Sequence, residues 1–362
     1  MRREVIFELM KLALSEDKVN FNAFADLDAN SWLDAFSVLN MHGVAPLVLN
    51  SLESLPAEMR PANVVVLKFI SSSVAAQKSY LKLTDRIKKL EEIIRGCGVK
   101  CMILKGVSLA DYYPKPELRK FSDIDIYAPD ASLFLDDVFE KRGMELDKIY
   151  YRHTHTTLGG VVVENHHCLL DVRGRKKLAE LDADLKRMAM EYLAEFEEPG
   201  LYSPNALFAL IFNLHHAFSH FIYEGISLKF LVDWILFLRK ENELLTSEHT
   251  ALALSKHSLL KFAAVMSEVS VRHLGLSLEE VPECIRSEME NLTADEVSRF
   301  IDDLFRPYEL VHRKNIVAER LNSVRRLVKS SWKPKVFLGQ STIGFVWDKF
   351  LPILMGKKFE AD

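Results

Sequence analysis

The chain has few of the features that mark secreted, membrane-spanning or nucleic-acid-binding proteins. It contains only four cysteines, and their spacing gives neither a CxxC pair nor a dense disulfide framework. We therefore expect reduced, buried thiols in a cytoplasmic protein. The formal net charge of −4 lacks the basic excess that nucleic-acid-binding proteins usually show, so we expect no duplex DNA or RNA as a partner.

Long apolar runs are also missing. No run reaches the roughly 18 apolar residues that a membrane span requires, so we expect no transmembrane helix. The first residues carry Glu4 and Glu8 within an apolar stretch, which indicates an amphipathic helix rather than a secretory signal. The apolar segment 343–355 is interrupted by Asp348 and Pro352, which favours a packed terminal segment over a membrane-surface anchor.

The composition is that of a folded protein, with 49% hydrophobic and 27% charged residues. The length of 362 residues is sufficient for two or three domains. We expect a helical region over 1–95, a core of strands and helices over 96–200, and a second helical region over 201–362. This order predicts an α+β fold in which a mixed sheet is flanked by helices.

Apolar spacing and turn residues predict the individual elements. We expect Ser31 to cap a helix that stops at Gly43, and a longer helix to follow Pro61 and end at Gly96. Strands are expected at 99–104, around Ile124, and at 146–152, 157–164 and 167–173. Further helices are expected at 131–142, 207–223, 226–239, 247–274 and 294–330.

Asp123 and Asp125 lie two residues apart in an otherwise apolar run. Alternation along a strand turns both carboxylates to the same face. Two carboxylates on one face repel each other unless a cation lies between them, and Mg²⁺ prefers one or two carboxylates together with substrate phosphates. We interpret the pair as a site for Mg²⁺ or Mn²⁺; the alternative is a solvated strand edge.

A third acid, Asp171, lies in the apolar run at 167–173. If this run is a strand beside the Asp123–Asp125 strand, three carboxylates converge on one edge of the sheet. Such a cluster can hold two metal ions around a polyphosphate. Asp171 would then complete the metal site and orient or deprotonate an attacking hydroxyl.

The residues from Lys105 to Ser108 fall at an expected strand-to-helix junction, which suits a phosphate. Gly106 permits close approach of the backbone, and a helix start offers unpaired N–H groups. Lys105 and Ser108 add donors, and Arg119 lies near enough to Asp123 in the sequence to reach the same polyphosphate. The alternative is an ordinary turn.

Several histidines occur in pairs: His153 and His155, His166 and His167, and His216 and His220. No pair belongs to HExxH or a comparable signature, so we do not expect a dedicated zinc site. We expect His216 and His220 to line a cleft beside the sheet or to be core histidines. Lys229 and Asp233 either contact a nucleotide or form an i,i+4 ion pair, which is the favoured interpretation.

Taken in order, these motifs resemble a bacterial nucleotidyltransferase family of the DNA polymerase β-like nucleotidyltransferase superfamily. The resemblance lies in Leu104-Lys-Gly-Val-Ser-Leu, Tyr112-Tyr-Pro, Arg119, Ser122-Asp-Ile-Asp-Ile and Leu170-Asp-Val-Arg, and it extends over residues 30–240. It implies a nucleotidyltransferase fold in which Gly106 and Ser108 form the phosphate turn. Asp123 and Asp125 become the metal pair, and Asp171 becomes the third acid.

The resemblance also implies a reaction. A nucleoside monophosphate would pass from a nucleoside triphosphate, ATP among them, to a hydroxyl of an unknown acceptor, with two metal ions and release of pyrophosphate. One alternative is a phosphotransferase that acts on a carbohydrate or a lipid-linked head group. The other is a catalytically silent nucleotide-binding or antitoxin-like partner protein. The oligomeric state does not follow from the sequence.

Overall fold

A computed structural model describes residues 3–15, 19–148, 151–172, 175–241, 245, 248–306, 330–341 and 344.

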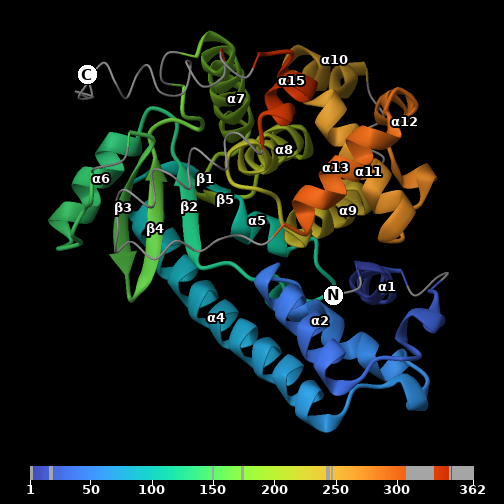
Figure 1. Ribbon diagram of the computed structural model, residues 1–362. Coiled ribbons are helices and arrows are strands. Elements are labelled where there is room, and N and C mark those ends of the chain that lie inside the picture. Colours follow the sequence, from blue (N-terminus) through green and yellow to red (C-terminus); the bar gives the residue numbers. More distant parts are fainter. Residues whose placement is uncertain are drawn as a thin grey trace, which may run out of the picture.

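The N-terminal region is a group of helices. The first helices are α1 (Arg3–Leu14), α2 (Ala29–Met41), α3 (Ala45–Val48) and α4 (Asn63–Gly96). Short 3₁₀ helices lie in the connections: η1 (Phe21–Phe24), η2 (Leu49–Ser54), η3 (Ala57–Met59), η4 (Pro116–Leu118) and η6 (Leu278–Glu280). In Figure 1, α4 extends from the other N-terminal helices to the sheet.

The predicted cap of α2 is wrong by three residues. The side chain of Asp28 accepts a hydrogen bond from the Ser31 N–H at 2.8 Å, and Asp28 has the extended backbone of a capping residue. Aspartate and serine are both good capping residues, so residue type alone could not separate the two positions.

The middle region contains one five-stranded sheet in the order β3-β4-β2-β1-β5. The strands are β1 (Lys100–Leu104), β2 (Asp123–Tyr127), β3 (His153–Leu158), β4 (Val161–His166) and β5 (Gly200–Tyr202). β1 pairs antiparallel with β2 and parallel with β5, while β4 pairs parallel with β2 and antiparallel with β3. This mixed sheet with flanking helices confirms the predicted α+β fold.

The region after β4 is helical apart from β5. Its helices are α7 (Lys176–Ala194), α8 (Ala206–Tyr223), α9 (Leu228–Glu241), α10 (Glu248–Lys256), α11 (Leu260–His273), α12 (Glu283–Met289), α13 (Ala294–Leu304) and α15 (Trp332–Leu338). The expected helix at 247–274 is divided where Ser258 adopts a φ of 57°. Most of the expected helix at 294–330 and nearly all of the segment 343–355 lie outside the described residues.

The strands after α6 (Ser132–Lys141) differ from the prediction. The run 157–164 is divided between β3 and β4, because Gly159 and Gly160 both adopt positive φ and form a hairpin turn. The described part of 146–152 contributes an isolated bridge between Asp147 and His155.

The predicted strand at 167–173 is wrong, since its described residues 167–172 form no strand. Leu169 and Leu170 are buried in the helical core instead, and the Leu170 N–H donates to Asp182 of α7 at 2.8 Å. The apolar character of this run therefore reflects packing beneath a helix.

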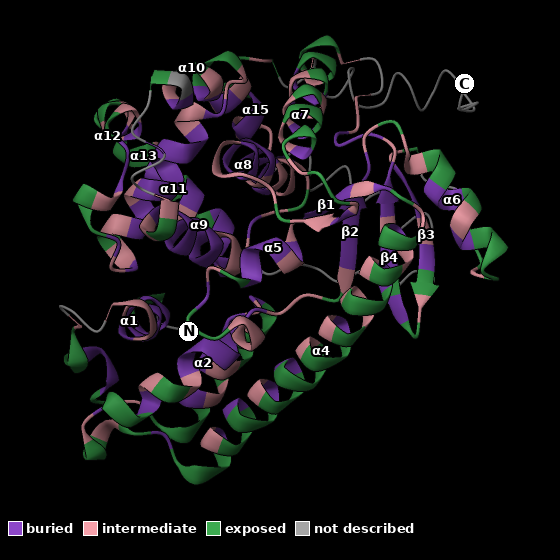
Figure 2. Ribbon diagram, turned by 180° about the vertical axis from the view of Figure 1, so that it is seen from behind, coloured by how far each residue is buried: buried purple, intermediate pink, exposed green. Residues whose placement is uncertain are grey.

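The two faces of the sheet are covered differently. One face packs against α4 and α6 through fully buried residues such as Leu90, Ile124 and Phe139. Figure 2 shows that α4 buries the side that meets the sheet and exposes its outer side. On the opposite face, Met102 and Leu104 of β1 join the large core of the helical regions. The neighbouring strands turn polar side chains to that face, as described below.

Among the described helices, α8 is long and apolar enough to cross a membrane by composition. Its 18 residues have a mean hydropathy of 1.2, and 61% of this window is buried inside the protein. Core helices of folded domains meet the same criterion, and the burial of α8 is that of a core helix.

A buried ion pair joins the loop before β2 to α9. Arg119 donates from Nε and Nη2 to the Asp233 carboxylate at 2.8 and 2.9 Å, and from Nη1 to the Gly106 carbonyl at 2.9 Å. The Tyr113 hydroxyl donates to the same carboxylate at 2.9 Å. The two charged side chains are only 5% and 8% exposed. Two parallel hydrogen bonds between buried, oppositely charged side chains make this pair a strong connection between distant segments.

Replacing Asp233 by asparagine should lower the free energy of unfolding by about 3–5 kcal/mol, because the Arg119 charge would remain buried without a counter-ion. Urea denaturation measures this change. Glu191→Gln on α7 is the matched control, since its ion pair with Arg187 is 63% and 60% exposed. We expect the control to change stability by less than about 1 kcal/mol. Equally small effects in both variants would contradict the structural role of Asp233.

Candidate functional site

Carboxylates from two neighbouring strands meet on one face of the sheet. Asp125 of β2 lies directly opposite Glu164 of β4, and Glu164 lies opposite His155 of β3. Opposite residues of paired strands point to the same face, as do residues two apart on one strand. Asp123 therefore shares this face, and three carboxylates gather there.

Asp125 is buried, with its side chain only 3% exposed. Lys105 Nζ donates to its Oδ1 at 2.5 Å, and His166 Nε2 lies 2.9 Å from the same oxygen. Burial alone would raise the pKa of Asp125, but the Lys105 charge and the His166 hydrogen bond outweigh it and hold this pKa well below its ordinary value. Asp125 is therefore an anion at neutral pH.

Asp123 and Glu164 complete the cluster. Burial raises the pKa of Asp123, and the negative charges of Asp125 and Glu164 raise it further. Burial would also raise the pKa of Glu164, but the His166 hydrogen bond and the Lys105 charge lower it. Burial and the two neighbouring carboxylates therefore outweigh the Lys105 charge at Asp123.

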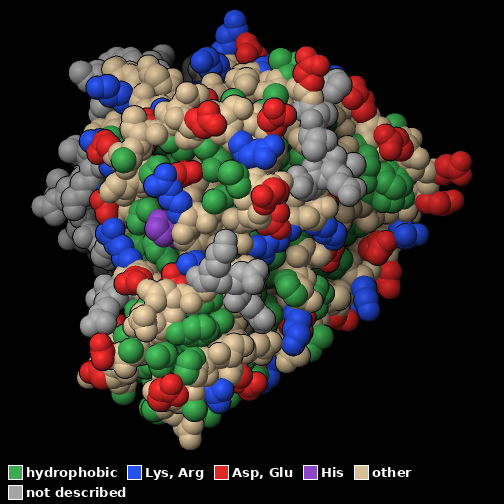
Figure 3. All heavy atoms as spheres, turned by 90° about the vertical axis from the view of Figure 1, so that its right-hand side faces the viewer, with side chains coloured by type: hydrophobic (Ala, Val, Ile, Leu, Met, Phe, Trp, Pro, Cys, Tyr) green, Lys and Arg blue, Asp and Glu red, His purple; other side chains and the backbone are tan. Residues whose placement is uncertain are grey.

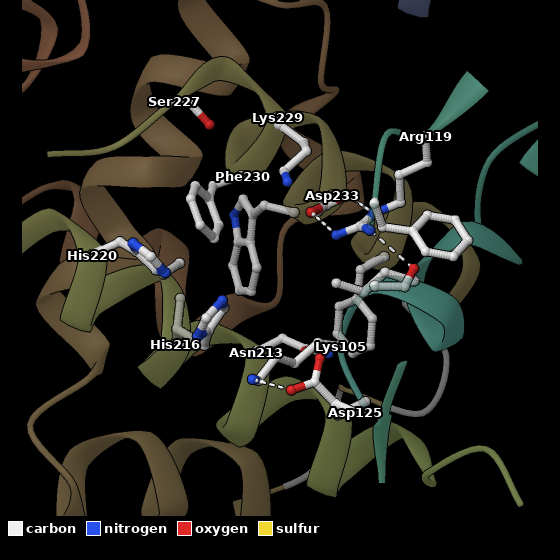
Figure 4. Close-up of a pocket in the computed structure, with 18 of the residues that line it drawn as sticks. Lys105, Arg119, Asp125, Asn213, His216, His220, Ser227, Lys229, Phe230 and Asp233 are labelled. Carbon is white, nitrogen blue, oxygen red and sulfur yellow. Dashed lines mark hydrogen bonds and ion pairs between the residues drawn. The ribbon is translucent and has the colours of Figure 1, made fainter. Parts of the chain in front are cut away.

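This face forms one wall of a cavity of about 420 Å³, a usual size for a small-molecule site. Helices α8 and α9 supply much of the opposite wall. Figure 4 shows Lys105 and Asp125 at one end of the cavity, with Ser227, Lys229 and Phe230 at the other. Apolar side chains also line it, including Leu210, Leu214, Phe230, Trp234 and Phe237.

The cavity brings together most of the residues that the sequence suggested: Lys105, Gly106, Arg119, Asp123, Asp125, His216, His220, Lys229 and Asp233. Ser108 and Asp171 do not line it. Ser108 is buried, and its hydroxyl donates to the Lys105 carbonyl at 3.0 Å, so it stabilises the turn. Asp171 lies in the loop after β4, where its Oδ1 is 3.5 Å from Arg175 Nη2.

Glu164, and not Asp171, is the acid that the structure places opposite Asp125. It lies on the strand beside β2 and lines the cavity opposite Asp125. The sequence contains a signal for the strand that carries Glu164, because Gly159 and Gly160 mark a hairpin turn and a strand follows them. The predicted strand at 157–164 ends at this acid, and the predicted neighbour of β2 is the next apolar run, at 167–173.

Asn213 of α8 is another cavity residue that the sequence did not reveal. Its Oδ1 is buried and accepts no hydrogen bond within the described part of the chain. A buried, unsatisfied polar atom costs about 1–3 kcal/mol, so a ligand that donates to it would gain affinity. Only the docking of α8 against the sheet places this side chain in the cavity.

The turn between β1 and α5 (Gly106–Ala110) has a specific geometry. Lys105 adopts a φ of 47°, which is rare for a residue with a side chain. A Cβ atom on Gly106 would lie 3.0 Å from the Phe121 Cβ, so this position favours glycine. The turn directs the Lys105 ammonium across the sheet face to Asp125.

Lys229 is a half-buried lysine of the cavity wall. Among the described side chains, Asp233 pairs with Arg119, so the expected intrahelical ion pair with Lys229 does not form. Burial lowers the pKa of Lys229, and the Arg119 charge lowers it further. A bound anion would oppose both effects.

The two cavity histidines of α8 lie close together, with ring centroids 4.6 Å apart. Burial, and then the Lys105 charge, lower the pKa of His216 well below its ordinary value, so its imidazole is neutral. His220 Nδ1 lies 2.9 Å from Glu224 Oε2 and its ring is 5.2 Å from Phe230.

The donor set of the sheet face fits a divalent cation. Ligand atoms of Asp125, Glu164 and His166 lie within 4.8 Å of one another, and Asp123 faces the same side. Carboxylate oxygens suit Mg²⁺ and Mn²⁺. A cation would also oppose the burial and the neighbouring carboxylate charges that raise the pKa of Asp123.

Surface charges of both signs are interspersed. On the face in Figure 3, described Lys and Arg side chains alternate with Asp and Glu, and no broad area has a single sign. This face therefore offers no basic track for a duplex phosphate backbone.

Comparison with known proteins agrees with the geometry of the cavity. A family model described as an uncharacterised nucleotidyltransferase matches residues 28–272, which include the whole sheet and all three carboxylates. No curated protein and no solved structure gives a match. Because the family model covers most of the chain, the protein belongs to this nucleotidyltransferase family.

Proposed function

We propose that this protein transfers a nucleoside monophosphate from a nucleoside triphosphate to a hydroxyl group of an acceptor and releases pyrophosphate. The acceptor oxygen forms a bond to the α-phosphorus, and the bond from that phosphorus to the pyrophosphate oxygen breaks. The observation that carries the proposal is the cluster of Asp123, Asp125 and Glu164, which faces a cavity of about 420 Å³.

The carboxylates have distinct roles in this proposal. Asp123 and Asp125 would hold two Mg²⁺ or Mn²⁺ ions, which when bound neutralise phosphate charge and lower the pKa of the attacking hydroxyl. Glu164 takes the part expected of Asp171: it orients the hydroxyl and receives its proton on the carboxylate. His166 contacts both Asp125 and Glu164, at 2.9 and 3.5 Å, and holds them in place.

Positive side chains of the cavity would bind the triphosphate. Lys229 is suited to this role because it is half-buried and Asp233 pairs elsewhere. Lys105 supplies a second charge at the opposite end, beside Asp125. Arg119 would position the Gly106 turn and α9 and would not bind phosphate itself, because its Nε, Nη1 and Nη2 already donate to Asp233 and to the Gly106 carbonyl.

The wall from α8 and α9 would receive the base and the acceptor. The buried Asn213 Oδ1 can accept a hydrogen bond from a hydroxyl or amino group. Phe230 and Trp234 offer aromatic faces against which a base or a sugar ring can pack. We expect the acceptor to be a small hydroxyl-bearing molecule or a side chain that enters the cavity.

Nucleotides labelled in the α- or γ-phosphate test the reaction. The protein is incubated with each labelled nucleoside triphosphate, Mg²⁺ or Mn²⁺ and a cell extract, and products are identified by mass. We expect α-label in a product, with transfer reduced at least about 100-fold in Asp123→Asn, as for the loss of a group that stabilises the transition state. Transfer of γ-label would indicate a phosphotransferase. Nucleotide binding without any transfer would indicate a silent partner protein.

Glu164→Gln and Asp171→Asn decide which residue is the third acid. A ligand at one hundred times its dissociation constant adds about 2.7 kcal/mol to the stability of the folded protein, which is visible as a higher melting temperature. We expect Glu164→Gln to lose the metal-dependent part of the shift with a nucleoside triphosphate, and Asp171→Asn to keep it. The reverse pattern would return the role to Asp171.

Lys229→Gln should weaken binding of a nucleoside triphosphate about 10- to 100-fold, the effect of removing a hydrogen bond from a charged donor to phosphate. Calorimetric titration measures this change. Lys240→Gln is the matched control on the same helix, because Lys240 is exposed and its Nζ donates to the Asp111 carbonyl at 3.3 Å. Unchanged affinity in Lys229→Gln would place the phosphates elsewhere.

A further inference from the structure

We propose that His153, His155 and Glu164 form a binding site for a divalent transition-metal ion of the zinc type at the edge of the sheet. The sequence did not favour a zinc site, because the third ligand is 9 residues from the nearer histidine and no zinc signature links them. The β3–β4 hairpin brings the three side chains together. Their ligand atoms all lie within 4.8 Å of one another.

The pairing of β3 with β4 fixes this arrangement. His155 lies directly opposite Glu164, and His153 lies opposite His166, so all of them point to the face that carries Asp125. β3 is the outermost strand on this side of the sheet. Neighbouring strands are about 4.8 Å apart, so His155 lies about 10 Å from Asp125 across the strands.

The distances between ligand atoms suit one ion. Two ligands of a tetrahedral zinc ion, each about 2.1 Å from it, lie about 3.4 Å from each other. His155 Nε2 lies 3.1 Å from Glu164 Oε1, and His153 Nδ1 lies 3.8 Å from Glu164 Oε2. These values, each to a different oxygen of the Glu164 carboxylate, lie on either side of the tetrahedral distance.

The imidazoles are oriented as a pair. The rings of His153 and His155 are stacked, with centroids 4.6 Å apart and planes inclined by 11°. Arg152 Nε donates a long hydrogen bond of 3.4 Å to His153 Nδ1. A metal ion would take the place of that weak contact.

The ligand types select the metal. Imidazole nitrogens favour zinc and its transition-metal neighbours over Mg²⁺, and two histidines with one glutamate are a ligand set of zinc enzymes. The side chains of His155, Glu164 and His153 are 26%, 15% and 9% exposed, so an ion can enter from solvent. Three protein ligands leave a fourth position for water or another small ligand.

Glu164 connects this site to the carboxylate cluster. Its Oε1 faces His155, while its Oε2 lies 3.5 Å from His166 and 3.9 Å from Lys105. Oε1 therefore faces His155 on the edge strand, and Oε2 lies between His153 and the cluster. An ion at the edge would fix the Glu164 side chain and thereby position it for the proposed reaction.

Cobalt binding tests the site, because Co²⁺ adopts zinc geometry and gives visible absorption bands. The full-length protein is stripped with a chelator and titrated with Co²⁺ in the absence of nucleotide, and Zn²⁺ is then added to displace it. We expect one equivalent with intense tetrahedral bands, displaced by Zn²⁺, and at least tenfold weaker binding in His155→Gln and His153→Gln. His257→Gln is the control, because His257 pairs with Asp184 at 3.2 Å, away from the sheet.

No tight Co²⁺ binding by the wild type would overturn the inference. Equal binding by His155→Gln and the control would also overturn it, as would a loss confined to Asp123→Asn. Circular dichroism of each variant verifies that the protein remains folded. The titration contains no nucleotide, so a protein that binds Co²⁺ but transfers no nucleotide would keep this inference and lose the proposed function.

Discussion

Repulsion between carboxylates is the constraint around which this site is built. Strand alternation turns Asp123 and Asp125 to one face, and the parallel pairing of β2 with β4 adds Glu164 beside them. Three acids in a partly buried place are tolerable only with compensating positive charge and hydrogen bonds. Lys105 and His166 supply these to Asp125 and Glu164, while Asp123 keeps a raised pKa. This face of the sheet therefore concentrates negative charge that a bound cation would offset.

The rest of the fold makes that face available. Helices α4 and α6 cover the opposite face of the sheet, so a polar side chain that pointed to that face would be buried. On the site face, α8 and α9 stand across a cavity and do not pack directly on the carboxylates. The Arg119–Asp233 pair holds α9 in this position, because it connects α9 to the loop before β2 and to the Gly106 turn. The contacts that stabilise the fold therefore also shape the cavity.

Local patterns in the sequence predicted the parts of the site that depend on a single segment. The Asp123–Asp125 pair follows from alternation along one strand, and the Lys105–Gly106 turn follows from a strand-to-helix junction. Glu164 was not predicted as a site residue because its place opposite Asp125 depends on which strand lies beside β2, and apolar runs do not reveal that long-range pairing. The same reason explains Asp171, whose neighbours are apolar because they pack under α7. Asn213 and the partner of Arg119 depend on helix docking, which no short motif encodes.

A crystal structure with Mn²⁺ and a nucleoside triphosphate analogue that cannot be cleaved between the α- and β-phosphates tests most directly whether the three carboxylates bind metal ions beside a bound triphosphate. Anomalous scattering locates the manganese without reference to the protein coordinates. We expect manganese bound to carboxylate oxygens of Asp123, Asp125 and Glu164, with the triphosphate in the same cavity and near Lys229. Manganese and phosphates bound away from this face of the sheet, or ions held by Asp171 in place of Glu164, would contradict it.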